Sequence, residues 1–159
     1  MELRIGNGYD VHALEEGLPM WLGGVNIPSA VGFVAHSDGD VAIHALCDAI
    51  LGALALGAIG HLFPDTSAEW KGFDSKILLA KVVALIGERG FRVGNADITI
   101  ALQVPKLAPY ILTMRETLAG VMGVPVDAVS VKATTTERLG FVGRGEGCEV
   151  WASVTVIKP

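Results

Sequence analysis

Alternation between apolar and polar residues is the main structural signal along this chain of 159 residues. Successive side chains of a β-strand point to opposite faces, so a period of two predicts a strand with one buried face. This pattern predicts a short hairpin at residues 20–27, turning at Gly23 and Gly24, and strands at residues 3–12, 92–102, 130–136 and 148–157.

Longer apolar stretches between these strands predict helices at residues 40–56, 75–89 and 107–122. Ser37 or Asp38 is expected to cap the first helix, because short polar side chains accept hydrogen bonds from first-turn N–H groups. Residues 41–60 approach the length of a membrane span, but His44 and Asp48 within them favour a buried core helix.

Strands interleaved with helices predict an α+β (α/β-like) fold in a single domain of residues 1–159. We expect one mixed four-stranded sheet plus the small hairpin, with helices on one face of the sheet. Hydrophobic residues make up 51% of the chain and charged residues only 18%, which indicates a surplus of apolar surface. We therefore expect a partner subunit to cover the other face of the sheet in a homo-oligomer.

Charge and cysteine content narrow the class of protein. The net charge is −5 and no basic run occurs, which argues against nucleic-acid binding. Cys47 and Cys148 lack CxxC spacing and predict no disulfide framework, which fits a reducing cytoplasm. The N-terminus has no apolar core typical of a secretory signal, so we expect a cytoplasmic protein with no membrane segment.

Three residues near the N-terminus form a candidate metal site. Asp10 and His12 lie two apart on a predicted strand, so their side chains share one face. If the first helix packs against that strand, His44 supplies a third ligand, and one carboxylate with two imidazoles suits a catalytic divalent metal. The alternatives are a surface ion pair between Asp10 and His12 and a core histidine bonded to Asp40 or Asp48.

Further residues have the chemistry of phosphate binding. His36 precedes a predicted helix start, where backbone N–H groups favour anions. Three threonines, 134–136, precede Glu137, a candidate magnesium ligand, and Arg144 lies between glycines. Lys106 follows Pro105 at a strand-to-helix turn. The alternatives are β propensity for the threonines, a solvated lysine, and a plain turn at residues 63–66.

Familiar nucleotide and nucleophile motifs do not occur in the sequence. There is no GxxxxGK[ST] loop and no GxGxxG opening a helix. Neither cysteine has a nearby basic partner, and no nucleophile elbow occurs, so a covalent intermediate is not indicated.

Five motifs resemble one enzyme family, the 2-C-methyl-D-erythritol 2,4-cyclodiphosphate synthases of the non-mevalonate isoprenoid pathway. They are Asp10-Val11-His12, residues 36–46 beginning His-Ser-Asp-Gly-Asp, residues 62–66, Pro105-Lys106, and residues 132–141 beginning Lys-Ala-Thr-Thr-Thr-Glu. The resemblance spans essentially the whole chain, in order. The His-Ser-Asp-Gly-Asp and Thr-Thr-Thr-Glu blocks together are highly specific.

The resemblance implies a metal-dependent phosphorus–oxygen lyase of the bacterial cytoplasm. Its substrate would be 4-diphosphocytidyl-2-C-methyl-D-erythritol 2-phosphate, and its products the cyclic diphosphate and CMP. It also implies a homotrimer whose sheets face the trimer axis and whose active sites lie between neighbouring subunits. An isoprenoid diphosphate could bind in the central channel.

The same resemblance assigns roles to individual residues. Asp10, His12 and His44 would hold Zn²⁺ or another divalent cation. Glu137 would help to hold Mg²⁺ or Mn²⁺ on the substrate diphosphate. The residues implied to stabilise the transition state are His36 and Thr135. Those implied to bind substrate are Ser37, Ala58, Ile59, Gly60, Phe63, Pro64, Asp65, Thr66, Ser67, Leu102, Gln103, Val104, Pro105, Lys106, Leu107, Ala108, Thr134, Thr136, Phe141 and Arg144.

The chain departs from the family pattern at two positions. Many relatives have Asp-Ile-Gly where this chain has Ala-Ile-Gly at residues 58–60, and that aspartate is expected to bind the erythritol hydroxyls. Either binding is weaker here, or Asp48 or Ser37 compensates. Ser67 stands where an acidic residue is common. Two other functions stay open from the residues alone: a zinc hydrolase of phosphate esters, and a ligand-binding trimer anchored by Arg144.

Overall fold

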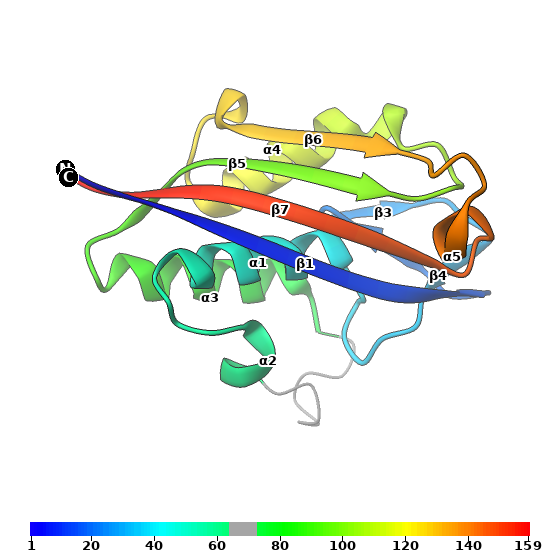
Figure 1. The fold of residues 1–159 in the computed structure, drawn as a ribbon, viewed down its shortest axis with the longest axis horizontal. Coiled ribbons are helices and arrows are strands. Elements are labelled where there is room, and N and C mark those ends of the chain that lie inside the picture. Colours follow the sequence, from blue (N-terminus) through cyan, green and yellow to red (C-terminus); the bar gives the residue numbers. More distant parts are fainter. Residues whose placement is uncertain (64–72) are drawn as a thin grey trace.

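The computed structural model describes residues 1–63 and 73–159 and contains a mixed five-stranded sheet. The sheet order is β4-β1-β7-β5-β6 (Figure 1). β5 and β6 are parallel, and the other neighbouring pairs are antiparallel. The strands are β1 (Glu2–Glu16), β4 (Val31–Phe33), β5 (Arg92–Ala101), β6 (Val129–Thr134) and β7 (Gly147–Lys158).

The prediction of a mixed sheet is confirmed, but the expected number of four strands is wrong. Strand β4 falls between the predicted hairpin and the first predicted helix, where no element was predicted, and it pairs with the far end of β1 from Leu14↔Phe33 to Glu16↔Val31. Three residues are too few for alternation to stand out in a sequence, so β4 gave no signal. The predicted hairpin is confirmed as a separate two-stranded sheet of β2 (Met20–Leu22) and β3 (Val25–Ile27).

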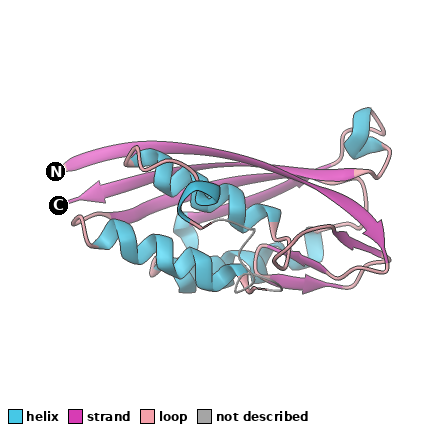
Figure 2. Ribbon diagram, turned by 90° about the horizontal axis from the view of Figure 1, so that it is seen from below, coloured by secondary structure: helices cyan, strands magenta, loops and turns pink. Residues whose placement is uncertain are grey.

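The three longer helices lie on one side of the sheet, as Figure 2 shows. Helix α1 packs against β1 and β7, with α3 beside it, while α4 contacts β6. Their bounds are α1 (Val41–Ala53), α3 (Ser75–Gly87) and α4 (Ile111–Met122). The shorter helices are α2 (Ile59–Leu62), η2 (Ala108–Tyr110), η3 (Val126–Ala128) and α5 (Gly140–Gly143). Both α2 and α5 fall within segments for which no helix or strand was predicted.

Helix α1 is the buried centre of the fold. Among its residues, Ile43, Leu46 and Ile50 are completely buried. The expectation of a core helix is confirmed, and within the described residues no helix is long and apolar enough to cross a membrane.

The N-cap of α1 is Asp40 rather than the expected Ser37 or Asp38. The buried carboxylate of Asp40 accepts hydrogen bonds from Ile43 N at 3.0 Å, Gly23 N at 2.9 Å and Gly24 N at 2.7 Å. Burial and the neighbouring charge of Asp38 raise the pKa of Asp40 to about 6, although these N–H donors favour the charged form. Asp40 therefore ties the hairpin turn to the start of the helix.

Two glycines of β1 allow α1 to approach the strand closely. A Cβ added at Gly6 would lie 1.8 Å from the carbonyl oxygen of Ala49, and one at Gly8 would lie 1.9 Å from that of Ala45. Both distances are far inside van der Waals contact, so any side chain here would push the helix away from the sheet.

We expect Gly8→Ala to destabilise the protein by about 2–4 kcal/mol, because the new methyl group overlaps the α1 backbone. Gly52→Ala is a matched control on α1, since among the described residues a Cβ there meets only Asn7 O at 3.7 Å. It should be neutral or stabilise by about 0.5–1 kcal/mol through helix propensity. Equilibrium denaturation of both variants checks this, and a Gly8→Ala variant as stable as Gly52→Ala would contradict the packing argument.

Candidate functional site

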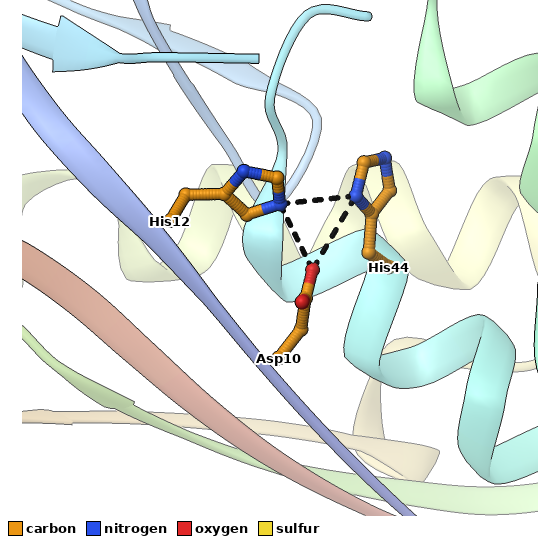
Figure 3. A group of neighbouring side chains, drawn as sticks. All are labelled: Asp10, His12 and His44. Atoms are coloured by element: carbon orange, nitrogen blue, oxygen red, sulfur yellow. Dashed lines mark hydrogen bonds and ion pairs between the residues drawn. The ribbon is translucent and has the colours of Figure 1, made fainter. Parts of the chain in front are cut away.

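Asp10, His12 and His44 converge at the junction of β1 and α1. Figure 3 shows the two β1 side chains pointing toward His44 on the helix. Asp10 Oδ2 lies 2.9 Å from His12 Nε2 and 3.4 Å from His44 Nδ1. The two histidine nitrogens are 3.3 Å apart. The expectation that α1 packs against the first strand and brings in His44 is therefore confirmed.

The three side chains could hold a divalent metal ion. Each offers one ligand atom, and these atoms all lie within 4.8 Å of one another. Two imidazole nitrogens and a carboxylate oxygen form a donor set typical of catalytic zinc, which keeps a further position open. The side chains of His12 and His44 are 17% and 12% exposed, so the cluster is accessible from one side.

The charges in the cluster stabilise each other. Burial favours the neutral form of Asp10, but its hydrogen bonds to His12 and His44 outweigh this, and its pKa is held well below the usual range. Burial likewise acts to lower the pKa of His44, but the Asp10 hydrogen bond and the charges of Asp40 and Asp38 outweigh it, so this pKa is raised. Asp10 is thus an anion ready to ligate, while protons compete for His44.

The cluster opens into a cavity of about 500 Å³. The cavity brings together several residues predicted from the sequence: Asp10, His12, His36, Ser37, His44, Ile59, Gly60 and Phe63. Its other lining residues are Val34, Ala35, Asp48, Phe73, Ser75 and Leu78. Asp48, on α1, accepts a hydrogen bond from Ile59 N at 2.8 Å and so fixes the start of α2 beside the cavity.

Ser75 and Asp38 are the residues that sequence reasoning missed as supports of the cluster. Ser75, the first residue of α3, is buried, and its Oγ lies 3.0 Å from His44 Nε2. Both its hydroxyl and its N–H bond to the carboxylate of Asp38. The sequence signal was a helix start, which does not indicate a tertiary contact with His44.

A second cavity, of about 260 Å³, lies where β5 and β6 end. It shares no lining residue with the first cavity among the described residues. Leu102 N donates to Thr134 O at 3.0 Å, which holds the two strand ends together. The predicted residues that line it are Leu102, Gln103, Pro105, Lys106, Leu107, Ala108, Thr134 and Thr135.

The turn after β6 has an unusual backbone. Glu137 and Arg138 have φ angles of 55° and 64°, in the left-handed region that ordinary residues avoid at a cost of about 1–2 kcal/mol each. Arg138 N donates to Gln103 Oε1 at 3.2 Å, and Thr136 Oγ1 donates to Leu139 O at 2.7 Å. These bonds hold the turn beside the second cavity with the side chain of Glu137 exposed.

Several predicted residues line neither cavity. Ala58 is the exposed N-cap of α2, and Val104 is exposed beside the second cavity. Arg144 is exposed, and its Nε lies 3.0 Å from Glu146 Oε1. Phe141, on α5, is 36% exposed. Pro64, Asp65, Thr66 and Ser67 lie outside the described residues.

The mixed sheet, its one layer of helices and the Asp-His-His cluster define an α+β protein with a site able to hold a divalent metal ion. The chain belongs to the YgbB family, whose model matches residues 3–157. A 2-C-methyl-D-erythritol 2,4-cyclodiphosphate synthase from Thioalkalivibrio sulfidiphilus is 62% identical over 145 residues, which cover 91% of each chain. The resemblance stated from the motifs is thereby confirmed.

Solved structures with a similar fold support the same family assignment. A 2C-methyl-D-erythritol-2,4-cyclodiphosphate synthase in a CDP-bound form has a TM-score of 0.89 and 41% identity, covering 97% of this chain and 100% of its own. The bifunctional IspDF from Campylobacter jejuni has a TM-score of 0.94 and 45% identity over 98% of this chain. The present chain spans 42% of the length of that bifunctional protein. Since its curated relatives are synthases, the chain is an enzyme.

We expect His12→Gln to weaken Zn²⁺ binding by at least about 100-fold, because it removes one of three ligands. His61→Gln is the matched control, since His61 is exposed on α2 and lies outside the cluster. Affinity for Zn²⁺ should also fall as the pH falls. Protons compete with the metal for the imidazole of His44, and its raised pKa makes that competition stronger. Calorimetric titration measures all three effects, and equal losses in both variants would contradict this assignment.

Proposed function

We propose that residues 1–159 form one enzymatic domain that converts 4-diphosphocytidyl-2-C-methyl-D-erythritol 2-phosphate to 2-C-methyl-D-erythritol 2,4-cyclodiphosphate and CMP. The enzyme would be a metal-dependent phosphorus–oxygen lyase of isoprenoid biosynthesis. One observation carries the proposal: in a chain whose family match covers residues 3–157, the metal-capable cluster opens directly into a cavity large enough for a small phosphorylated substrate.

The reaction needs no nucleophile from the protein. An oxygen of the substrate's 2-phosphate attacks the β-phosphorus of the diphosphate and forms the new P–O bond. The bond from that phosphorus to the bridging oxygen breaks, and CMP leaves with this oxygen. Phosphoryl transfer of this kind is catalysed mainly by positioning and by neutralising charge. Both cysteines are buried and carry raised thiol pKa values, so neither is prepared as a nucleophile.

Asp10, His12 and His44 would hold the zinc ion, and their donor set fits this metal. When bound, Zn²⁺ would supply positive charge to the phosphoryl oxygens. Glu137 would help to hold Mg²⁺ or Mn²⁺ on the diphosphate. Its side chain is exposed beside the second cavity, so its carboxylate oxygens are accessible to such an ion.

His36 and Thr135 would both stabilise the transition state, although they line different cavities of one chain. His36 lines the metal cavity, where an imidazole N–H can donate to a phosphoryl oxygen. Thr135 lines the second cavity, and its Oγ1 accepts from Glu137 N at 3.3 Å, which leaves its hydroxyl proton available to a phosphate. The segment from Leu102 to Ala108 would bind the cytidine part there, with Lys106 near its phosphates.

A homotrimer would unite the two cavities, since each chain would complete its neighbour's site. The support is the open face of the sheet, opposite the helices. On β1, Leu3 is 57% exposed, Ile5 77%, Tyr9 46% and Val11 43%, and on β7 Trp151 is 40% exposed. A band of this kind is unusual on a monomer and typical of a surface covered by other subunits.

We expect Ile5→Glu to break the trimer, because a carboxylate would be buried in this apolar face. Leu112→Glu is the matched control: Leu112 is 57% exposed but lies on α4, on the helical side. Sedimentation velocity should give a trimer for the wild-type chain and for Leu112→Glu, and smaller species for Ile5→Glu. A monomeric wild-type chain would contradict the trimer.

The open face also contains a hollow of about 470 Å³ lined by residues of β1, β5 and β7, among them Ile5, Asn7 and Thr155. This observation favours a second role for the trimer, in which the central channel takes an isoprenoid diphosphate. Arg144, at the α5 end of the sheet, would contact the diphosphate.

Ala58 leaves the erythritol hydroxyls without the aspartate of many relatives. The two residues expected to compensate, Asp48 and Ser37, both line the metal cavity. Asp48 uses Oδ1 to accept from Ile59 N, so its second oxygen is the one available to a substrate hydroxyl. This geometry supports Asp48 as the compensating carboxylate.

Phosphorus NMR on the purified protein with substrate and Mg²⁺ tests the proposed reaction directly. We expect the cyclic diphosphate and CMP, and at least about 100-fold slower turnover after a chelator removes Zn²⁺, because charge at the phosphoryl oxygens is lost. Added Zn²⁺ should restore the rate. Open-chain phosphate products would instead indicate a hydrolase, in which a metal-bound water attacks phosphorus.

A further inference from the structure

The two ring nitrogens of His44 face different surroundings. Nδ1 points to the metal-capable cluster, 3.4 Å from Asp10 Oδ2 and 3.3 Å from His12 Nε2. Nε2 points the other way, 3.0 Å from Ser75 Oγ. A neutral imidazole carries its proton on one nitrogen only, and the other nitrogen alone can ligate a metal.

The hydrogen bonds of Ser75 determine which nitrogen of His44 carries the proton. The hydroxyl of Ser75 has one proton, and Asp38 Oδ1 lies 2.5 Å away. An ionised carboxylate only accepts, so this proton goes to Asp38. The Ser75 oxygen can then only accept from His44 Nε2–H. In the neutral ring this leaves Nδ1 unprotonated toward the cluster, so Nδ1 donates to Asp10 only when the ring carries both protons.

Asp38 is itself held in a fixed orientation. Its Oδ1 also accepts from Asp40 N at 3.0 Å, and its Oδ2 accepts from Ser75 N at 2.8 Å. Asp38 N donates to Phe73 O at 3.1 Å, so the segments on both sides of the contact are joined by backbone as well. The carboxylate therefore cannot turn away from Ser75 without losing several bonds.

We propose that Asp38 and Ser75 are positioning residues that hold His44 as its Nε2–H tautomer, with Nδ1 presented to the metal. The inference rests on the metal site of the proposed function and deepens it. Hydrogen bonds of this kind behind a ligating histidine typically change metal affinity by about 10–100-fold.

Ser37 is the competing hydroxyl, and its geometry is weaker. Its Oγ lies 3.5 Å from His44 Nε2, at the limit of a hydrogen bond, and it accepts from Gly39 N at 3.2 Å. Ser75 is also a good position for substitution. Asp74 is the N-cap of α3 and bonds Lys76 N, so replacing Ser75 leaves the cap intact.

The first test measures the tautomer in the wild-type chain, without any variant. Long-range ¹H–¹⁵N NMR of metal-free protein under alkaline conditions, where the imidazole carries a single proton, should show the proton of His44 on Nε2. Zinc addition should then shift the Nδ1 signal. A proton on Nδ1 would overturn the proposal, whatever the stability of any variant.

The second test compares Ser75→Ala with Ser37→Ala by competition with a zinc chelator. We expect Ser75→Ala to bind Zn²⁺ about 10–100-fold more weakly and to show mixed His44 tautomers, and Ser37→Ala to change the affinity less than about threefold. Ser75→Thr, which keeps the hydroxyl, should restore the single tautomer. Unaltered zinc affinity and an unaltered His44 tautomer in Ser75→Ala would overturn the positioning role of Asp38 and Ser75.

Failure of the positioning role proposed for Asp38 and Ser75 can be told apart from failure of the proposed function. Suppose that the wild-type chain binds Zn²⁺ and forms the cyclic product, while Ser75→Ala keeps its zinc affinity and its His44 tautomer. Then only the positioning role is wrong. If the wild-type chain binds no Zn²⁺, both the metal site and the positioning role are wrong.

Discussion

The close contact between α1 and β1 is the constraint on which the rest of the structure depends. Gly6, Gly8, Asp10 and His12 all lie on the helix-facing side of β1, because they alternate with period two. The two glycines have no side chain, so the helix backbone rests almost on the strand. The next two positions on the same face, Asp10 and His12, are candidate metal ligands, and the helix presents His44 to them. The glycines that allow the close packing and the residues that carry the candidate chemistry therefore follow one another along the same face of β1.

The other face of β1 has a different character. Leu3, Ile5, Tyr9 and Val11 alternate with the glycines and ligands, and they are exposed in the single chain. One strand therefore contributes two of the three candidate ligands and most of the apolar residues that a partner subunit would cover. Because the two sets of side chains alternate strictly, the proposed assembly and the proposed metal binding would respond separately to substitutions one residue apart.

Local rules predicted the parts of the site that lie close together in sequence. The two-residue spacing was enough to place Asp10 and His12 on one face, and the apolar run was enough to predict a buried helix carrying His44. The approach of that helix to the strand was only assumed, since no local rule fixes helix position. Gly6 and Gly8 carried that information, but a glycine within a strand is equally typical of a bulge or a sharp bend.

Other features depended on contacts between distant segments and gave no local signal. The cap was expected at Ser37 or Asp38, but Asp40 takes it because its buried oxygens also satisfy the hairpin turn. Ser75 supports His44 from 31 residues away along the chain. The roles expected of the residues at the ends of β5 and β6 came only from the resemblance to a family, since the chemistry of these residues alone left plain structural alternatives open.

The hydrogen bonds from Gly23 and Gly24 to Asp40 give the small hairpin a significance beyond its size. Asp40 begins the helix turn that carries His44, so the hairpin turn sets where that helix starts. Exchanging this turn for one of another shape would displace His44, a candidate metal ligand that the turn does not contact. For anyone altering this protein, a large distance between a loop and the cavity is therefore not enough to show that the loop can be exchanged without moving His44.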